Sequence, residues 1–214
     1  MARWIVLQLA DAAFPAGGFA HSSGLEAAAR LGELRDLDAF VDASLWQAGH
    51  ASIPYVGAAW DASERIAELD AMCDALLVSH VANRASRAQG RGLASACARI
   101  FDLRAIDDAC RARELRVHLA PAFGAIARAL DLTRDEALEV HLHGTLRGIV
   151  SAAIRLNLIG PHEAQRATRE RAKLLDRVLA TCANIPAEHA AQCAPLVDLF
   201  GTAHDRLDVR LFVS

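Results

Sequence analysis

The residues whose types and spacing could support chemistry are concentrated in one short segment, FPAGGFAHSSGLE, at positions 14–26. Within it, Ala20-x-Ser22-x-Gly24 differs by one residue from the G-x-S-x-G elbow, where a strand delivers a nucleophilic serine to a tight turn. The preceding residues, WIVLQLADAA, are typical of a helix or an irregular segment. His21 is adjacent to Ser22, which is not how a catalytic base is normally supplied. The sequence therefore disfavours a serine hydrolase that uses Ser22, and this activity stays open only as an alternative.

A phosphate-binding loop is the second kind of chemistry that this segment suggests. Gly17 and Gly18 precede an expected helix, where backbone N–H groups can bind an anion. A nucleotide-binding P-loop also needs Lys followed by Ser or Thr, and the chain's only lysine is Lys173. We therefore expect no nucleotide hydrolysis. The simplest interpretation is a helix entrance, because Ser23-x-x-Glu26 has the form of a capping box, although capping does not explain the aromatic residues and the histidine.

Metal binding is the third possibility, because the chain has nine histidines and five cysteines. His141 and His143 lie two residues apart in an expected helix, so their side chains point to different faces. Glu139 and His143 share a face, but two ligands do not make a site. A metallochaperone that binds its metal through His141, His143, His162 or the cysteines therefore stays a second alternative.

Length and composition indicate one cytoplasmic domain. The chain has 214 residues, 53% of them hydrophobic, which is enough for one sizeable core and short for two. A formal net charge of -3 gives no indication of nucleic-acid binding. We find no signal-peptide pattern and no run of about 18 apolar residues, and an odd number of widely spaced cysteines is typical of a reducing compartment. We expect a cytoplasmic protein with no membrane span.

Helices must position these candidate residues, since strong helix formers dominate and alternating strand patterns are missing. We expect an all-α, single-domain bundle of roughly eight to ten helices. The clearest helix follows Thr133, whose capping box with Glu136 precedes apolar residues at every third or fourth position. A looser box is expected at Asp61-x-x-Glu64. Helices are expected near 3–11, 23–32, 37–50, 62–80, 83–101, 121–131, 134–157, 161–183 and 187–203, with 102–120 and 204–214 the least certain stretches.

Gly90 and Gly92 interrupt the expected helix at 83–101. In a helix interior each glycine costs about 1 kcal/mol relative to alanine. Such a cost is typical of close helix packing, so we assign these glycines a packing role in preference to a phosphate-binding role.

Four segments, taken in order, resemble the urease accessory protein F family. Residues 7–28, LQLADAAFPAGGFAHSSGLEAA, are similar to its N-terminal signature, and residues 83–93, NRASRAQGRGL, are similar to its second block. Residues 118–160 resemble its third block, whose long helix ends in S-A-A-x-R-L, and residues 203–214, AHDRLDVRLFVS, resemble its C-terminal tail. The resemblance covers nearly the whole chain.

The resemblance implies an all-α protein that is not an enzyme and that helps to mature urease. It implies an adaptor that binds the accessory protein D/H, forms a homodimer and recruits the accessory GTPase of the G type to apo-urease. Nickel is the metal that this assembly delivers, so no cofactor is expected to stay bound to this chain, and GTP hydrolysis belongs to the partner. The metallochaperone alternative would instead bind this nickel directly.

The resemblance also divides the chain into a helical domain, residues 1–203, and a partner-binding tail, residues 204–214. Asp208 and Val213 depart from the Tyr and Arg that are usual in the family's tail. We expect one partner surface in the glycine-rich segment (residues 14–26) and another in the tail, where Arg210 would pair with a carboxylate and the next two residues would bury apolar surface. The residues concerned are Phe14, Pro15, Gly17, Gly18, Phe19, His21, Ser22, Gly24 and Glu26 in the first, and Arg206, Arg210, Leu211 and Phe212 in the second.

Overall fold

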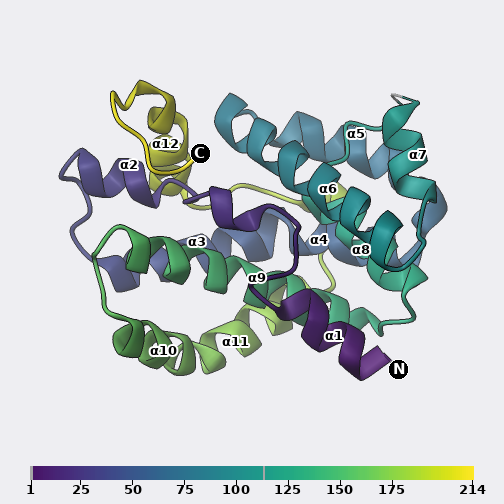
Figure 1. Cartoon of the computed structure of the whole chain (residues 1–214), viewed down its shortest axis with the longest axis horizontal. Coiled ribbons are helices and arrows are strands. Elements are labelled where there is room, and N and C mark those ends of the chain that lie inside the picture. The colour runs from purple at the N-terminus through teal and green to yellow at the C-terminus, as the bar shows by residue number, and fades with distance from the viewer. Residues whose placement is uncertain (1, 113) are drawn as a thin grey trace.

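The computed structural model describes residues 2–112 and 114–214, and every regular element in these residues is helical. The all-α class is confirmed (Figure 1). The α-helices are α1 (Ala2–Ala10), α2 (Leu25–Arg30), α3 (Leu37–Ala51), α4 (Ile53–Asp61), α5 (Ile66–Leu76), α6 (His80–Ile100), α7 (Ala105–Arg111), α8 (Leu119–Ala129), α9 (Arg134–Arg155), α10 (Pro161–Glu170), α11 (Ala172–Cys182) and α12 (Pro195–Ala203). Four 3-10 turns join them, η1 (Gly18–Ala20), η2 (Ser63–Arg65), η3 (Ala187–His189) and η4 (His204–Arg206).

The described residues thus contain more helices than the eight to ten expected, for identifiable reasons. Helix α4 was not expected, and α7 lies in a stretch that the sequence left uncertain. The expected helix 161–183 is divided into α10 and α11 at Arg171. The Arg171 side chain is buried there and donates to the carboxylates of Asp38 and Asp42 on α3 at 2.7 and 2.8 Å, so the break coincides with a polar link between two helix layers.

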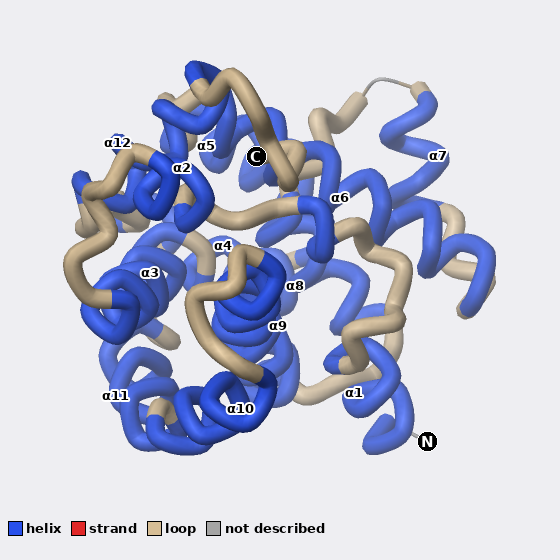
Figure 2. Tube along the Cα trace, turned by 60° about the vertical axis from the view of Figure 1, so that its left-hand side comes forward, coloured by secondary structure: helices blue, strands red, loops and turns tan. Residues whose placement is uncertain are grey.

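Helix α9 is the central element of the bundle. Its predicted start is confirmed, because the Thr133 hydroxyl accepts the Glu136 N–H at 3.2 Å and the Glu136 carboxylate accepts the Thr133 N–H at 2.8 Å. The predicted apolar stripe is also confirmed, since Leu138, Leu142 and Leu146 are at most 2% exposed, and burying each such side chain contributes about 2 kcal/mol. Helix α9 contacts α1, α2, α3, α4, α8, α10 and α11, and Figure 2 shows α8 and α9 surrounded by the other helices.

Glycines allow the closest helix contacts. A Cβ at Gly124 on α8 would collide with the carbonyl oxygen of Val56 on α4, and one at Gly90 on α6 would collide with the carbonyl oxygen of Val117 before α8. A Cβ at Gly92 would lie 3.0 Å from the carbonyl oxygen of Ala16. The packing role predicted for Gly90 and Gly92 is confirmed, because backbone atoms of other segments occupy the space of a side chain.

Two predicted capping boxes are wrong. Helix α2 begins after Gly24, and Ser23 makes no capping hydrogen bond, because both residues have positive φ, 54° for Ser23 and 86° for Gly24. The Glu26 carboxylate is used elsewhere, as described below. Asp61 is the last residue of α4, where its carboxylate accepts a hydrogen bond from Arg134, and no side chain caps the start of α5. In both places tertiary contacts take the side chain that local capping would have used.

Among the residues that the structure describes, no helix combines the length and the apolar character needed to span a membrane.

Candidate functional site

The tail (residues 204–214) folds back onto the glycine-rich segment (residues 14–26). Figure 1 shows the yellow tail returning past α2 to the purple N-terminal part of the chain. The Ser22 N–H donates to the Ser214 carbonyl at 2.6 Å, and the Val213 N–H donates to the Ala20 carbonyl at 2.8 Å. The two segments that the sequence singled out separately therefore form one structural unit.

Glu26 is the centre of this unit. Its side chain is fully buried at 0% exposure, yet both carboxylate oxygens have hydrogen-bond partners. The Leu211 N–H donates to Oε1 at 2.7 Å and the Phe212 N–H donates to Oε2 at 3.1 Å. His204 Nε2 also lies 3.1 Å from Oε2, and Arg30 Nε donates to Oε1 at 2.8 Å. The carboxylate thus joins α2 to both ends of the tail.

These contacts decide the protonation of Glu26. Burial by itself raises the pKa of a carboxyl group. Hydrogen bonds from the Leu211 amide, from Arg30 and from His204, followed by that from the Phe212 amide, outweigh burial, and the pKa of Glu26 is lowered. The group is therefore a buried anion held by directed donors, the arrangement that makes a buried charge tolerable.

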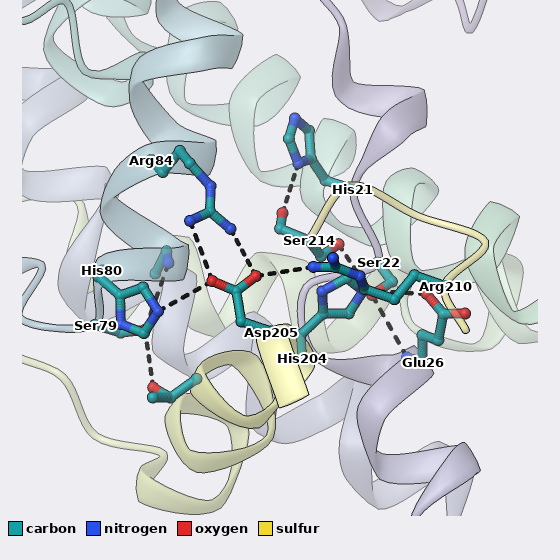
Figure 3. Close-up of polar contacts among 12 residues, drawn as sticks. His21, Ser22, Glu26, Ser79, His80, Arg84, His204, Asp205, Arg210 and Ser214 are labelled. Carbon is teal, nitrogen blue, oxygen red and sulfur yellow. Dashed lines mark hydrogen bonds and ion pairs between the residues drawn. The ribbon is translucent and has the colours of Figure 1, made fainter. Parts of the chain in front are cut away.

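Ser22 and His21 contact the end of the tail and do not form a nucleophile with its base. The Ser22 hydroxyl is fully buried, donates to the Ser214 carbonyl at 3.1 Å and accepts the Glu26 N–H at 3.4 Å. His21 Nδ1 lies 2.6 Å from the Ser214 hydroxyl, as Figure 3 shows. Burial, with the nearby His204 and Arg84, lowers the pKa of His21. Because the Ser22 proton is directed at a carbonyl oxygen, the geometry opposes the serine hydrolase alternative.

Arg155, at the C-terminal end of α9, lies between two aromatic rings from opposite ends of the sequence. Its guanidinium carbon is 3.9 Å from the ring centre of Phe19 and 4.1 Å from that of Phe212. It also donates to the Phe19 carbonyl at 2.5 Å. Such cation–π contacts stabilise by roughly 0.5–2 kcal/mol each. Phe212 is 5% exposed beneath this stack, whereas Phe19 is 64% exposed.

A second polar cluster holds η4 against the start of α6. The Asp205 carboxylate accepts hydrogen bonds from Arg84 at 2.8 and 3.1 Å, and it lies 3.1 Å from both His80 Nε2 and Arg210 Nη1 (Figure 3). The hydrogen bond from Arg84 is the main reason that the pKa of Asp205 is lowered. The carboxylate that Arg210 pairs with in this structure is thus one of its own chain.

The remaining candidate residues are spread over the rim of the unit. Phe14 stacks on Phe101 after α6, with ring centres 6.3 Å apart, and Pro15 and Arg206 are exposed. Gly17 precedes η1 with a φ of 78°. A Cβ at Gly24 would lie 2.8 Å from the Gly201 nitrogen, so this glycine lets α2 approach α12.

A cavity of about 570 Å³ lies beneath the glycine-rich segment. His21 and Ser214 contribute to its wall, and His141 lines it from α9. Burial lowers the pKa of His141 to about 4, and its ring is tilted against Phe123 with centres 5.3 Å apart. His141 is therefore a neutral core histidine at neutral pH.

In the part of the chain that the structure describes, the histidines and cysteines named for metal binding do not form a cluster. His141 faces the cavity, His143 is partly buried and His162 is exposed on α10. Across residues 2–112 and 114–214, no three His, Cys, Asp or Glu side chains are grouped so that they could hold a metal ion. Burial raises the pKa of Cys73 and Cys97 to about 12, which opposes thiolate ligation.

Sequence reasoning missed Arg155, His204 and Asp205 as parts of the site. Arg155 lies within the S-A-A-x-R-L pattern of the third block, and His204 and Asp205 lie in the tail block. The signal was thus present in the sequence, but the pattern does not say which side chains meet in space.

Comparison with known proteins gives a consistent result. A protein-family model described as UreF matches residues 4–172. Over 99% of this chain and 92% of the relative, the chain is 33% identical to urease accessory protein F of Arabidopsis thaliana. It is 31% identical to urease accessory protein F of Oryza sativa subsp. japonica over 99% of the chain and 85% of the relative. It is also 29% identical to urease accessory protein UreF of Kocuria rhizophila, over 98% of the chain and 95% of the relative.

Proposed function

The chain belongs to the UreF family of urease accessory proteins, and from this premise we propose that it is a non-catalytic adaptor in urease maturation. In this proposal it binds the accessory protein D/H, forms a homodimer and recruits the G-type GTPase to apo-urease. Nickel is the cargo of the assembly. GTP hydrolysis belongs to the GTPase, which agrees with the missing Gly-Lys-Ser/Thr pattern in this chain. We place this role in the cytoplasm, where unpaired cysteines are the rule.

One observation supports the proposal: the docked tail and the glycine-rich segment together present exposed apolar side chains over a buried, hydrogen-bonded base. Phe19 is 64% exposed and Leu211 is 47% exposed, although buried residues, His21 and Phe212, lie close to them in the chain. Val209 and Val213 extend the apolar surface with 68% and 59% exposure. Exposed aromatic and aliphatic side chains on a pre-organised surface are suited to protein binding, because little ordering entropy is lost on association.

Point variants test this proposal better than deletion of the tail. Deletion would leave the buried Glu26 carboxylate without the donors from His204, Leu211 and Phe212, so a loss of binding could reflect misfolding. The experiment co-expresses the full chain with urease, the D/H protein and the G-type GTPase, and measures complex formation and urease activity. The variants are Phe19→Ala and Leu211→Ala, with Val78→Ala as the control, since Val78 is 82% exposed at the start of α6.

We expect the first two variants to stay folded by circular dichroism and to lose co-purification with at least one partner, together with urease activation. The control should behave as the wild type. Normal complex formation by both Phe19→Ala and Leu211→Ala would contradict the assignment of this surface.

A further inference from the structure

We propose that the cavity beneath the glycine-rich segment binds a small molecule with an apolar body and a single carboxylate group, and that the Arg147 guanidinium holds this carboxylate. The cavity has a volume of about 570 Å³, which lies within the range of roughly 300–1,000 Å³ that is usual for small-molecule sites. Such binding goes beyond the proposed role in urease maturation and does not depend on it.

One face of α9 forms a wall of the cavity. Val140, Gly144, Arg147 and Ser151 line it, and their spacing of three or four residues places them on one side of the helix. A Cβ at Gly144 would meet no atom within 4 Å, so the space in front of this part of the wall is open. The wall thus runs for about 10 Å from an arginine to a valine, which suits a ligand with a polar head and an apolar body.

Arg147 supplies a positive charge that lacks an anionic partner. Its Nε is buried and has no hydrogen-bond partner among the described residues. Burial lowers the pKa of the Arg147 guanidinium, and Asp11 opposes this shift through space, without a hydrogen bond. The Asp11 carboxylate instead accepts the Ala13 N–H at 2.8 Å. Because a desolvated charge without a partner is unfavourable, an anion that enters the cavity is stabilised beside Arg147.

The charged groups of the wall favour a carboxylate over a more highly charged anion. Among the described residues that line the cavity, Arg147 is the one arginine or lysine and Asp198 is the one acidic side chain. The Asp198 carboxylate accepts hydrogen bonds from the Gln47 amide at 2.9 Å. A phosphate group carries up to about two negative charges, which one arginine does not balance. A carboxylate carries one charge and pairs with a guanidinium through two parallel hydrogen bonds.

Apolar side chains from three other helices face the body of the ligand. Leu9 of α1, Leu93 of α6 and Phe123 of α8 line the cavity and are buried, so an apolar group placed against them is removed from water. Ala12 and Pro15 also line the cavity, yet they are exposed at the surface. The cavity therefore reaches the surface at the segment between α1 and η1, where a ligand can enter.

The test titrates the full-length protein with octanoate in a calorimeter and compares two probes that each lack one part of it. Octanamide keeps the apolar body and is neutral, whereas acetate keeps only the carboxylate. We expect octanoate to bind the wild type at least about tenfold more tightly than either probe. In two-dimensional NMR, octanoate should shift the amide signals of Gly144 and Gly148, which both line the cavity on α9.

Two variants separate the head of the ligand from its body. Arg147→Gln should weaken octanoate binding by about tenfold or more and leave octanamide binding unchanged. Its matched control is Arg87→Gln, because the Arg87 Nε is also buried without a partner among the described residues, whereas Arg87 is not part of the cavity wall. Gly144→Leu fills open space in front of α9 and should weaken the binding of both octanoate and octanamide. Circular dichroism checks that each variant is folded.

Three results would overturn the proposal: no binding of octanoate to the wild type at roughly millimolar concentrations, equal affinities for octanoate and octanamide, or octanoate binding that a folded Arg147→Gln leaves unchanged. If Arg147→Gln does not fold, Arg147→Lys takes its place. That change keeps the charge but removes the forked pairing, so it should also weaken octanoate binding and leave octanamide binding unchanged.

Discussion

The Glu26 carboxylate accepts the backbone N–H of Phe212 at 3.1 Å, across 186 residues of sequence. The same oxygen, Oε2, also forms a hydrogen bond with His204 Nε2. The other oxygen, Oε1, accepts hydrogen bonds from the Leu211 N–H and from Arg30 Nε. A buried anion with this set of donors fixes the path of the tail over α2. The surface that we assign to partner binding therefore depends on a residue that no partner can touch directly.

Replacing Glu26 by Gln should destabilise the fold by about 2–4 kcal/mol, because hydrogen bonds to a charged acceptor are lost and an amide N–H₂ is placed among donors. Urea unfolding followed by circular dichroism measures this difference. The matched control is Glu33→Gln, which alters an exposed carboxylate 3.9 Å from Arg35 and should change stability by less than about 0.5 kcal/mol. Equal stability of the two variants would contradict the role of Glu26.

The same residue should make stability depend on pH. The pKa of Glu26 is lower in the folded chain than the usual value of about 4.3 in an unfolded one. Its contribution is therefore fully present above the unfolded pKa and is lost as the pH falls through the folded pKa. The difference in unfolding free energy between the wild type and Glu26→Gln should shrink as the pH falls below the unfolded pKa of about 4.3. A constant difference through the acid range would contradict this assignment.

His141 should make the free energy of unfolding depend on pH in a separate, higher pH range. Burial lowers the pKa of His141 to about 4 in the folded chain, against about 6.5 in an unfolded one. The neutral imidazole therefore stabilises the fold above the unfolded pKa, and up to about 3 kcal/mol is lost as the pH falls from 6.5 to 4. The variant His141→Leu should lack this dependence. In NMR the wild-type His141 signals should not titrate above about pH 5, and a midpoint near 6.5 would refute its burial as a neutral group.

Two helix glycines should respond in opposite ways to the same substitution. Gly90→Ala places a methyl group against the Val117 carbonyl, and such overpacking costs about 1–3 kcal/mol. Gly144→Ala, on α9, meets nothing within 4 Å and should stabilise by up to about 1 kcal/mol through helix propensity. Thermal unfolding of the two variants gives the comparison. A stable Gly90→Ala protein would mean that α6 does not approach the residues before α8 so closely.

Exposed residues of the proposed partner surface should affect binding without affecting folding. Leu211→Ala keeps the backbone N–H that Glu26 accepts and removes a side chain that is 47% exposed. We expect an affinity loss of about tenfold or more for a partner that covers this surface, with the free energy of unfolding unchanged within about 0.5 kcal/mol. Titration calorimetry with the purified D/H protein and with the GTPase would measure it, and Val78→Ala provides the baseline.

The sequence by itself determined the helical character of the chain, the start and apolar stripe of α9, and the packing role of Gly90 and Gly92. These features depend on residues within a few positions of one another, so periodicity, capping patterns and helix propensity report them directly. The family resemblance also selected both segments of the candidate site. It did not show that the two segments touch.

Only the tertiary structure decided what Glu26 and Arg155 do. Locally, Glu26 fits a capping box with Ser23, and Arg155 is one more arginine near a helix end. In the folded chain, the tail offers Glu26 three donors, to which Arg30 of the same helix adds a fourth, in place of one backbone N–H. Arg155 lies between rings from residues 19 and 212. A local pattern carries no information about which distant backbone amides will be left without partners in the core, and those amides determined where the buried carboxylate points.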